Sequence, residues 1–299
     1  MTDNESGIPL QNGMKRFVYK KPRYWLHILL FILTIMTTYL IGLGNGPIGA
    51  LWYSGGLIIM LLSHEMGHFI TAKRYRVPVT LPYFIPIPLP PFGTMGAVIK
   101  MGGYIPNRRA LFDIGVAGPL TGMILIVPAV FFGLKMSSVV DVTTLGDSTI
   151  SLGDSLLFRL LARAALGPLP EGKDIILHPL AFAGWVGLLV TALNLLPIGQ
   201  LDGGHVIYAL FRKRSKIIST LFFFVLLYIC LFYYLGWFVL LIILVLIRRH
   251  PPTLYDVIPL DRKRKIIGFS MILIFLLAFT PVPFGFGEGL IPLIREHIF

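Results

Sequence analysis

The chain has 299 residues, of which 56% are hydrophobic and only 13% are charged, and its formal net charge is +12. A soluble domain usually carries about 25% charged residues, so this composition argues against a soluble protein and favours several membrane-spanning segments. The basic residues gather beside the apolar runs, and no nucleic-acid recognition motif accompanies them. We therefore expect membrane orientation, and not nucleic-acid binding, to account for the positive charge.

Apolar runs of membrane-spanning length alternate with basic segments along the chain. Five spans are predicted at about 24–43, 50–72, 110–134, 178–202 and 266–281. A further apolar stretch at 217–247 is either a tight hairpin turning near Tyr233 or one long tilted helix. Basic residues precede the first span and predict a cytosolic N-terminus. The pattern predicts an all-α polytopic membrane protein with about six or seven transmembrane helices.

A segment rich in proline and large apolar residues separates the second and third predicted spans. Seven prolines between Pro78 and Pro106 remove N–H donors that a continuous helix needs. Irregular backbone at membrane depth persists only where protein or a watery cavity satisfies its polar groups. We expect a re-entrant loop or a short membrane-associated β-hairpin here, with 94–104 as the candidate hairpin. The alternative is an ordinary cytosolic loop.

The stretch LLSHEMGHFI places two histidines and a glutamate inside the second predicted span. His64 and His68 are four residues apart, so both face the same way on a helix and can bind one Zn²⁺ ion. Glu65 can stand beside the metal without being a ligand and accept a proton from the attacking water. Ionisable residues inside a span are costly and are functional candidates by default. The alternative is that the three side chains only hydrogen-bond one another.

A zinc site with two histidines needs a third protein ligand. The intramembrane candidates are Asp113, at the entry of the third span, and Asp202, in QLDGGH at the end of the fourth. Topology favours Asp202, because the basic flanks place it and HEMGH at cytosolic helix ends, at similar depth. The other interpretation of Asp202 is a helix cap beside a Gly-Gly turn. His205 either orients this carboxylate or is an ordinary interfacial residue.

Three motifs resemble, in kind and in order, those of the site-2 protease family of intramembrane zinc metalloproteases: HEMGH, AGPLTG and NLLPIGQLDGG. The resemblance covers about residues 50–212. It implies one zinc ion per chain and assigns the site residues, with Glu65 as the catalytic base, metal ligands His64, His68 and Asp202, and substrate-binding residues Asn194 and Pro197. The last two match the family's N-x-x-P element, which engages or unwinds the substrate helix.

The resemblance also implies an activity. The chain is expected to hydrolyse peptide bonds within or next to transmembrane segments of other membrane proteins, in regulated intramembrane proteolysis. Its partners would be the lipid bilayer and a transmembrane substrate that has already been cut once, with the active site nearer the cytosolic face. We expect a short cytosolic tail at 1–23, the protease domain at 24–283 and a short C-terminal tail at 284–299. The oligomeric state stays open.

Alternatives from other classes are a metal transporter and a non-catalytic scaffold that binds membrane helices. A transporter is expected to string polar groups across the bilayer, whereas here they gather at one depth. A scaffold has no need of Glu65. Other membrane metalloproteases with an HExxH motif take their third ligand from a glutamate on a later helix. This chain has no glutamate between Glu65 and Glu171, and Glu171 lies in the predicted outer loop.

Overall fold

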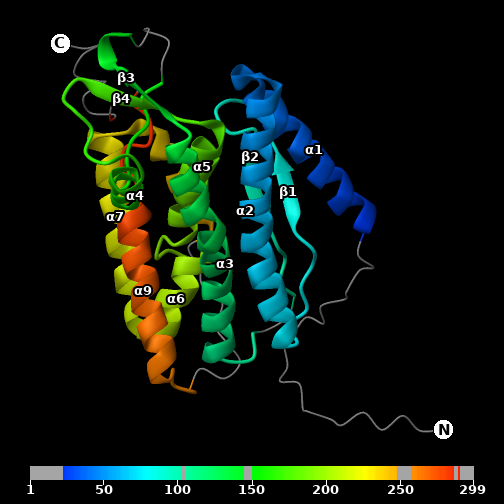
Figure 1. Cartoon of the computed structure of the whole chain (residues 1–299). Helices are drawn as coiled ribbons and strands as arrows, with labels where there is room; N and C mark the ends of the chain where they lie inside the picture. The colour runs from blue at the N-terminus through cyan, green and yellow to red at the C-terminus, as the bar shows by residue number, and fades with distance from the viewer. Residues whose placement is uncertain (1–22, 103–104, 145–149, 248–256, 286–288, 290–299) are drawn as a thin grey trace, which may run out of the picture.

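The computed structural model describes residues 23–102, 105–144, 150–247, 257–285 and 289 (Figure 1). Nearly all of the predicted N-terminal tail, and most of the predicted C-terminal tail, lie outside these residues. The helices are α1 (Tyr24–Gly42), α2 (Gly46–Arg74), α3 (Arg108–Lys135), α4 (Leu156–Leu166), α5 (Pro179–Asn194), α6 (Asp202–Phe211), α7 (Ser215–Phe232), α8 (Phe238–Ile247) and α9 (Arg262–Ala278). The strands are β1 (Tyr83–Pro86), β2 (Thr94–Val98), β3 (Ser138–Asp141) and β4 (Lys173–Ile176).

The chain is mostly helical and is a membrane protein, as the composition predicts. Among the described residues, three helical stretches are long and apolar enough to cross a membrane: Tyr24–Arg74, Arg108–Lys135 and Asp202–Phe232. Two shorter apolar stretches, Pro179–Asn194 and Leu235–Ile247, accompany them. Many large apolar side chains on these helices are exposed, which suits contact with lipid because the hydrocarbon core is as apolar as they are.

The interior of the bundle is formed by α2, α3 and α5 (Figure 1). Leu57 of α2, Ile126 of α3 and Trp185 of α5 are almost completely buried and belong to one apolar cluster. The helix α3 stays continuous although it contains Pro119 and Pro128. Such prolines are tolerated in membrane helices, since neighbouring helices satisfy the freed backbone groups.

The fourth apolar segment is broken before its aspartate. α5 ends at Asn194, and α6 begins at Asp202 after an irregular linker at 195–201. Pro197 lies inside this linker, where its missing N–H and its ring disfavour helical backbone. The break places Asn194 at one end of the linker and Asp202 at the other.

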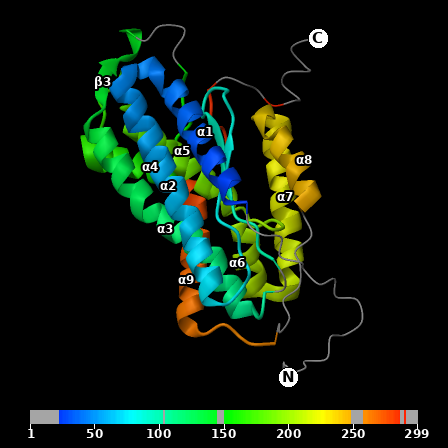
Figure 2. The ribbon, with the colours of Figure 1, turned by 90° about the vertical axis from the view of Figure 1, so that its right-hand side faces the viewer.

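The proline-rich segment contains a two-stranded antiparallel hairpin of β1 and β2, with Tyr83 opposite Val98. The prediction placed both strands within 94–104, and in that respect it was wrong. The first strand lies among the prolines instead. Pro86 is tolerated in it because this residue stands at the strand's end, beside an irregularity in the pairing. β1 lies against α1, and Nδ1 of His27 on α1 donates to the carbonyl oxygen of Pro82 at 3.0 Å. Figure 2 shows the hairpin between α1 and the pair α7 and α8.

The apolar stretch 217–247 is a helical hairpin, which decides between the two alternatives left open by the sequence. α7 and α8 are separated by a short turn that includes Leu235–Trp237. Nε1 of Trp237 donates to the carbonyl oxygen of Pro281 at 2.7 Å, which ties this turn to the segment after α9. Between α3 and α5 the chain forms α4 and a small antiparallel sheet of β3 and β4, and this sheet was not predicted.

Candidate metal centre

Three side chains of the metal-ligand type converge between α2 and the first residue of α6. Nε2 of His64 and Nε2 of His68 each lie 3.2 Å from Oδ2 of Asp202 and 3.2 Å from each other. Ligand atoms bound about 2.0–2.1 Å from a tetrahedral zinc ion stand about 3.3 Å apart, so the spacing suits such an ion. Within the described residues, this is the one group of three His, Cys, Asp or Glu side chains close enough to hold a metal.

Burial gives this convergence a physical meaning. His64 and His68 are 5% and 6% exposed, and the side chain of Asp202 is 15% exposed. A carboxylate in such surroundings is unfavourable unless it is paired or coordinates a metal. Two imidazole nitrogens and one carboxylate oxygen are also a donor set that zinc accepts in catalytic sites. The residues present therefore fit a zinc ion.

The orientation of His68 is set by a backbone carbonyl on α3. Nδ1 of His68 donates to the carbonyl oxygen of Ile114 at 2.7 Å. A histidine that donates from one ring nitrogen keeps a lone pair on the other, and metal-binding histidines almost always have such an outer partner. Nε2, which faces His64 and Asp202, is therefore the nitrogen available to a metal.

The AGPLTG motif of α3 makes room for the histidines of α2. A β-carbon at Gly118 would lie 2.0 Å from Nε2 of His68, so only glycine leaves space for the ring. A β-carbon at Gly67 of α2 would lie 2.3 Å from Oγ1 of Thr121. Small residues permit this close approach of two membrane helices.

Ser63 and Thr121 hold the same two helices together through reciprocal hydrogen bonds. The Ser63 hydroxyl donates to the carbonyl oxygen of Thr121 at 3.0 Å, and the Thr121 hydroxyl donates to that of Ser63 at 2.9 Å. Ser63 directly precedes His64, so the two hydrogen bonds fix the position of His64 along α3. Neither residue was predicted from the sequence, although a hydroxyl directly before HEMGH and another within AGPLTG were an available signal.

Glu65 is buried beside the cluster, with 6% of its surface exposed. The backbone N–H of Ile99 lies close to its carboxylate. Ile99 directly follows β2, so the hairpin ends next to the residue predicted to be the base.

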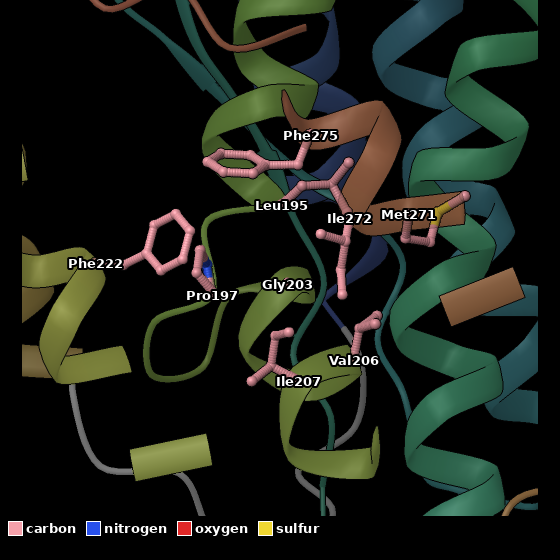
Figure 3. A pocket seen from close by; sticks show the side chains of 9 residues that line it. All are labelled: Leu195, Pro197, Gly203, Val206, Ile207, Phe222, Met271, Ile272 and Phe275. Carbon is pink, nitrogen blue, oxygen red and sulfur yellow. The ribbon is translucent and has the colours of Figure 1, made fainter. Parts of the chain in front are cut away.

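The two residues of the N-x-x-P element point to different places. Nδ2 of Asn194 lies 3.3 Å from Nε2 of His64, so Asn194 joins the cluster. Pro197 instead lines a small apolar pocket of about 40 Å³ between α6, α7 and α9, together with residues such as Phe222 and Ile272 (Figure 3). The carbonyl oxygen of Pro197 accepts a hydrogen bond from the Ser219 hydroxyl of α7 at 2.6 Å.

Asp113, the second candidate for a third ligand, is engaged elsewhere. Its carboxylate accepts hydrogen bonds from Arg264 of α9 and from the hydroxyl of Tyr75. His205 is buried on α6 and packs against Gly115 of α3. A β-carbon added at Gly115 would lie only 3.0 Å from the β-carbon of His205. The structure therefore gathers His64, His68, Asp202 and Asn194, and keeps Asp113 outside the cluster.

Comparisons with known proteins show which chains this one is similar to. The sequence profile described as Peptidase family M50 matches residues 52–236. The chain is 35% identical over 228 residues to "Probable zinc metalloprotease EGY1, chloroplastic" of Arabidopsis thaliana, covering 74% of this chain and 41% of the relative. It is 38% identical over 166 residues to the EGY1 protein of Oryza sativa subsp. japonica, covering 53% and 28%. The chain thus spans less than half the length of these relatives.

Proposed function

Because this chain belongs to peptidase family M50, we propose that it is an intramembrane zinc endopeptidase acting on other membrane proteins. It would hydrolyse peptide bonds within or next to their transmembrane segments, in regulated intramembrane proteolysis. The observation that carries the proposal is the convergence of two histidines and an aspartate beside a buried glutamate, on helices apolar enough to lie in a membrane.

One zinc ion per chain would be held by His64, His68 and Asp202. When bound, zinc supplies Lewis acidity to the scissile carbonyl and to the attacking water. The protein's part is to hold these ligands in place. The Ile114 carbonyl orients His68, and the side-chain amide of Asn194 lies against His64.

Glu65 is the proposed catalytic base. Its carboxylate would take a proton from the attacking water and return it to the leaving amine. The backbone N–H of Ile99, close to this carboxylate, would restrain its direction. Burial beside the cluster keeps bulk water away from the proton that is transferred.

The hairpin offers a place for an extended substrate. A substrate helix must unwind first, because its carbonyls are occupied by its own hydrogen bonds. Within the described residues β2 pairs only with β1, so one edge of β2 has no strand beside it. A peptide that adds to such an edge gains main-chain hydrogen bonds, and β2 leads to Ile99 and hence to Glu65. Asn194, beside His64, and Pro197, in the linker after α5, would supply the further substrate contacts that the N-x-x-P element implies.

The proposed arrangement in the membrane follows from the charge pattern. In α2 the two histidines lie nearer the end that carries Lys73 and Arg74, and α6 leads from Asp202 to the basic residues Arg212–Arg214. By the positive-inside rule these ends face the cytosol, as does the N-terminus. The protease domain would occupy 24–283 with six or seven crossings and act on a substrate already cut once.

A metal transporter or a helix-binding scaffold explains the site less well. Among the described residues the candidate ligands gather at one depth instead of forming a path across the bilayer. Neither alternative accounts for Glu65 beside the ligands.

The direct test compares cleavage and zinc content in purified variants. Glu65→Gln should keep its zinc and lower cleavage of a model transmembrane substrate by about 10²–10⁴-fold, the usual contribution of a general base. Asp202→Asn should lower zinc content itself. Glu171→Gln, in an exposed position distant in sequence from the motif, is the control and should behave like the unchanged chain. Full cleavage by Glu65→Gln would rule out the proposed base.

A further inference from the structure

We propose that Tyr75, Asp113 and Arg264 form a positioning hub that holds His68 in its metal-binding orientation from outside the cluster. The three residues come from three elements that meet at one end of the bundle: the end of α2, the start of α3 and the start of α9 (Figure 1). This inference rests on the proposed metal site and adds residues to which neither the motifs nor the family resemblance gives a role.

The hub is built on a two-point contact between Arg264 and Asp113. Nε of Arg264 donates to Oδ1 of Asp113 at 2.8 Å, and Nη2 donates to Oδ2 at 2.6 Å. The Tyr75 hydroxyl donates to Oδ2 of the same carboxylate. A paired arginine–carboxylate contact fixes direction as well as distance, because both groups are planar. Asp113 is thus held in one orientation from two sides.

Neighbouring contacts hold Arg264 itself in place. Asp261 caps α9 by accepting from the backbone N–H of Arg264 at 2.9 Å, and its carboxylate also accepts from the Arg264 guanidinium. Nε of Arg109, in the first turn of α3, donates to the carbonyl oxygen of Pro259 at 2.9 Å. The start of α9 is therefore joined to the start of α3 at two places.

The connection to the metal cluster runs through the first turns of α3. Asp113 directly precedes Ile114, whose carbonyl oxygen accepts the Nδ1 hydrogen bond of His68. One turn further, the missing side chain of Gly118 provides the space for the His68 ring. A displacement of α3 at Asp113 would therefore move both the hydrogen-bond acceptor and the wall against which the ring lies.

Side-chain hydrogen bonds join α2 to α3 both before and after the HEMGH motif, and the hub supplies the second of these contacts. Before the motif, Ser63 and Thr121 exchange hydrogen bonds between α2 and α3. After it, Tyr75 is bonded to Asp113. Two ties prevent the helices from separating at either end, whereas one alone would let them pivot. α9, which supplies Arg264, lies outside the part matched by the family profile.

A purely stabilising ion pair would make a different prediction. The side chains of Arg264 and Asp113 are 26% and 22% exposed, and pairs of this exposure usually stabilise a fold only slightly. Such a pair could change the melting temperature but would leave the surroundings of His68 as they are. The test must therefore read out His68 itself.

The experiment uses the full chain in proteoliposomes and compares Arg264→Gln with Arg262→Gln. Arg262 is an exposed arginine on the same turn of α9, which makes it a matched control. In the metal-free chain, the rate of His68 modification by diethyl pyrocarbonate is measured by mass spectrometry, with His178 as an internal reference. The zinc dissociation constant is measured by competition with a chelator.

Arg264→Gln should raise the His68 modification rate severalfold and weaken zinc binding by about tenfold, the lower range for lost outer partners of metal ligands. Arg262→Gln should match the unchanged chain. Arg264→Lys keeps the charge but loses the two-point contact, so it should fall in between. It also serves as the deciding variant if Arg264→Gln does not fold.

An unchanged His68 modification rate in a folded Arg264 variant would overturn the hub. Neither measurement uses catalysis, and the first needs no metal. A chain that binds zinc but cuts no substrate would therefore sink the proposed enzyme and leave the hub standing.

Discussion

The antiparallel pairs α2–α3 and α7–α8 are both apolar, yet they are used in different ways. α2 and α3 approach so closely that Gly67 and Gly118 have no room for a β-carbon, and hydroxyl groups bond across their seam. Half of the residues in the most apolar 18-residue segment of α3 are buried inside the bundle. In the corresponding segment of Asp202–Phe232, which contains α7, only 17% are buried. Leu246 of α8 is 78% exposed. α2 of the first pair carries two of the three candidate metal ligands, and the second pair mostly faces outward.

The difference shows what fixes helix positions in a membrane. Lipid tails are as apolar as leucine, so hydrophobicity cannot decide which helices touch. Small residues and interhelical hydrogen bonds decide it instead. The α2–α3 pair has both, and α7 contributes to the site mainly through the hydrogen bond from Ser219 to the Pro197 carbonyl.

The largest effect is expected from Gly118→Ala. The new methyl group would lie where the His68 ring now is, so zinc affinity should fall by about 100-fold, the upper range for disturbed ligand surroundings. Overpacking should also destabilise the fold by about 1–3 kcal/mol. Gly55→Ala on α2 is the control, since its β-carbon would meet no atom within 4 Å. Equal zinc affinity in both variants would contradict the described fit of α2 against α3.

A smaller effect is expected where the two hydroxyls are removed. Ser63→Ala and Thr121→Val should each destabilise the protein by about 0.6–2 kcal/mol, the range for interhelical hydrogen bonds in membranes. The double variant should lose less than the sum, because the two hydrogen bonds form one reciprocal unit. Reversible unfolding in mixed micelles gives the four free energies. Strict additivity would show that the two residues act separately.

Ser219→Ala should have a weaker effect. It removes the donor to the Pro197 carbonyl and should destabilise by about 0.6 kcal/mol, an average membrane hydrogen bond. Because the linker carries Asp202 at its far end, zinc affinity should fall slightly while the α2–α3 seam stays intact. Chelator competition measures the first effect and unfolding the second. Restoration by Ser219→Thr would assign the effect to the hydroxyl.

The smallest effect is expected on α8. Leu246→Ala removes a side chain that faces outward, so stability should change by less than about 0.5 kcal/mol and zinc affinity should not change. Unfolding and chelator titration under the same conditions as for Gly118→Ala test this. A loss as large as that of Gly118→Ala would mean that the outer face of α8 packs against protein.

Much of the site could be predicted because its parts are short-range. The four-residue spacing of His64 and His68 places both on one helix face, whatever the remaining fold is. The basic flanks also suggested that Asp202 lies at the depth of the motif, and the structure brings these three side chains together. The mainly helical membrane fold followed from apolar length and low charge.

The missed features depend on pairings between distant segments. The first strand of the hairpin lies among prolines, so local pattern gave no reason to expect it there. The β3–β4 sheet joins two short segments about thirty residues apart. Asp113 looked like a possible ligand until its partners were known. Its carboxylate is bound instead by Arg264, which lies 151 positions further along the chain.

By itself, the sequence determined the kind of protein and the chemical groups of its site, since apolar length, charge flanks and helical spacing act within one element. Only the tertiary structure decided which carboxylate meets the histidines, which carbonyl orients His68 and where α9 is anchored. The physical reason is that apolar helices in lipid have many nearly equivalent neighbours. A few small residues and buried hydrogen bonds select among them, and these contacts exist only once the helices have packed.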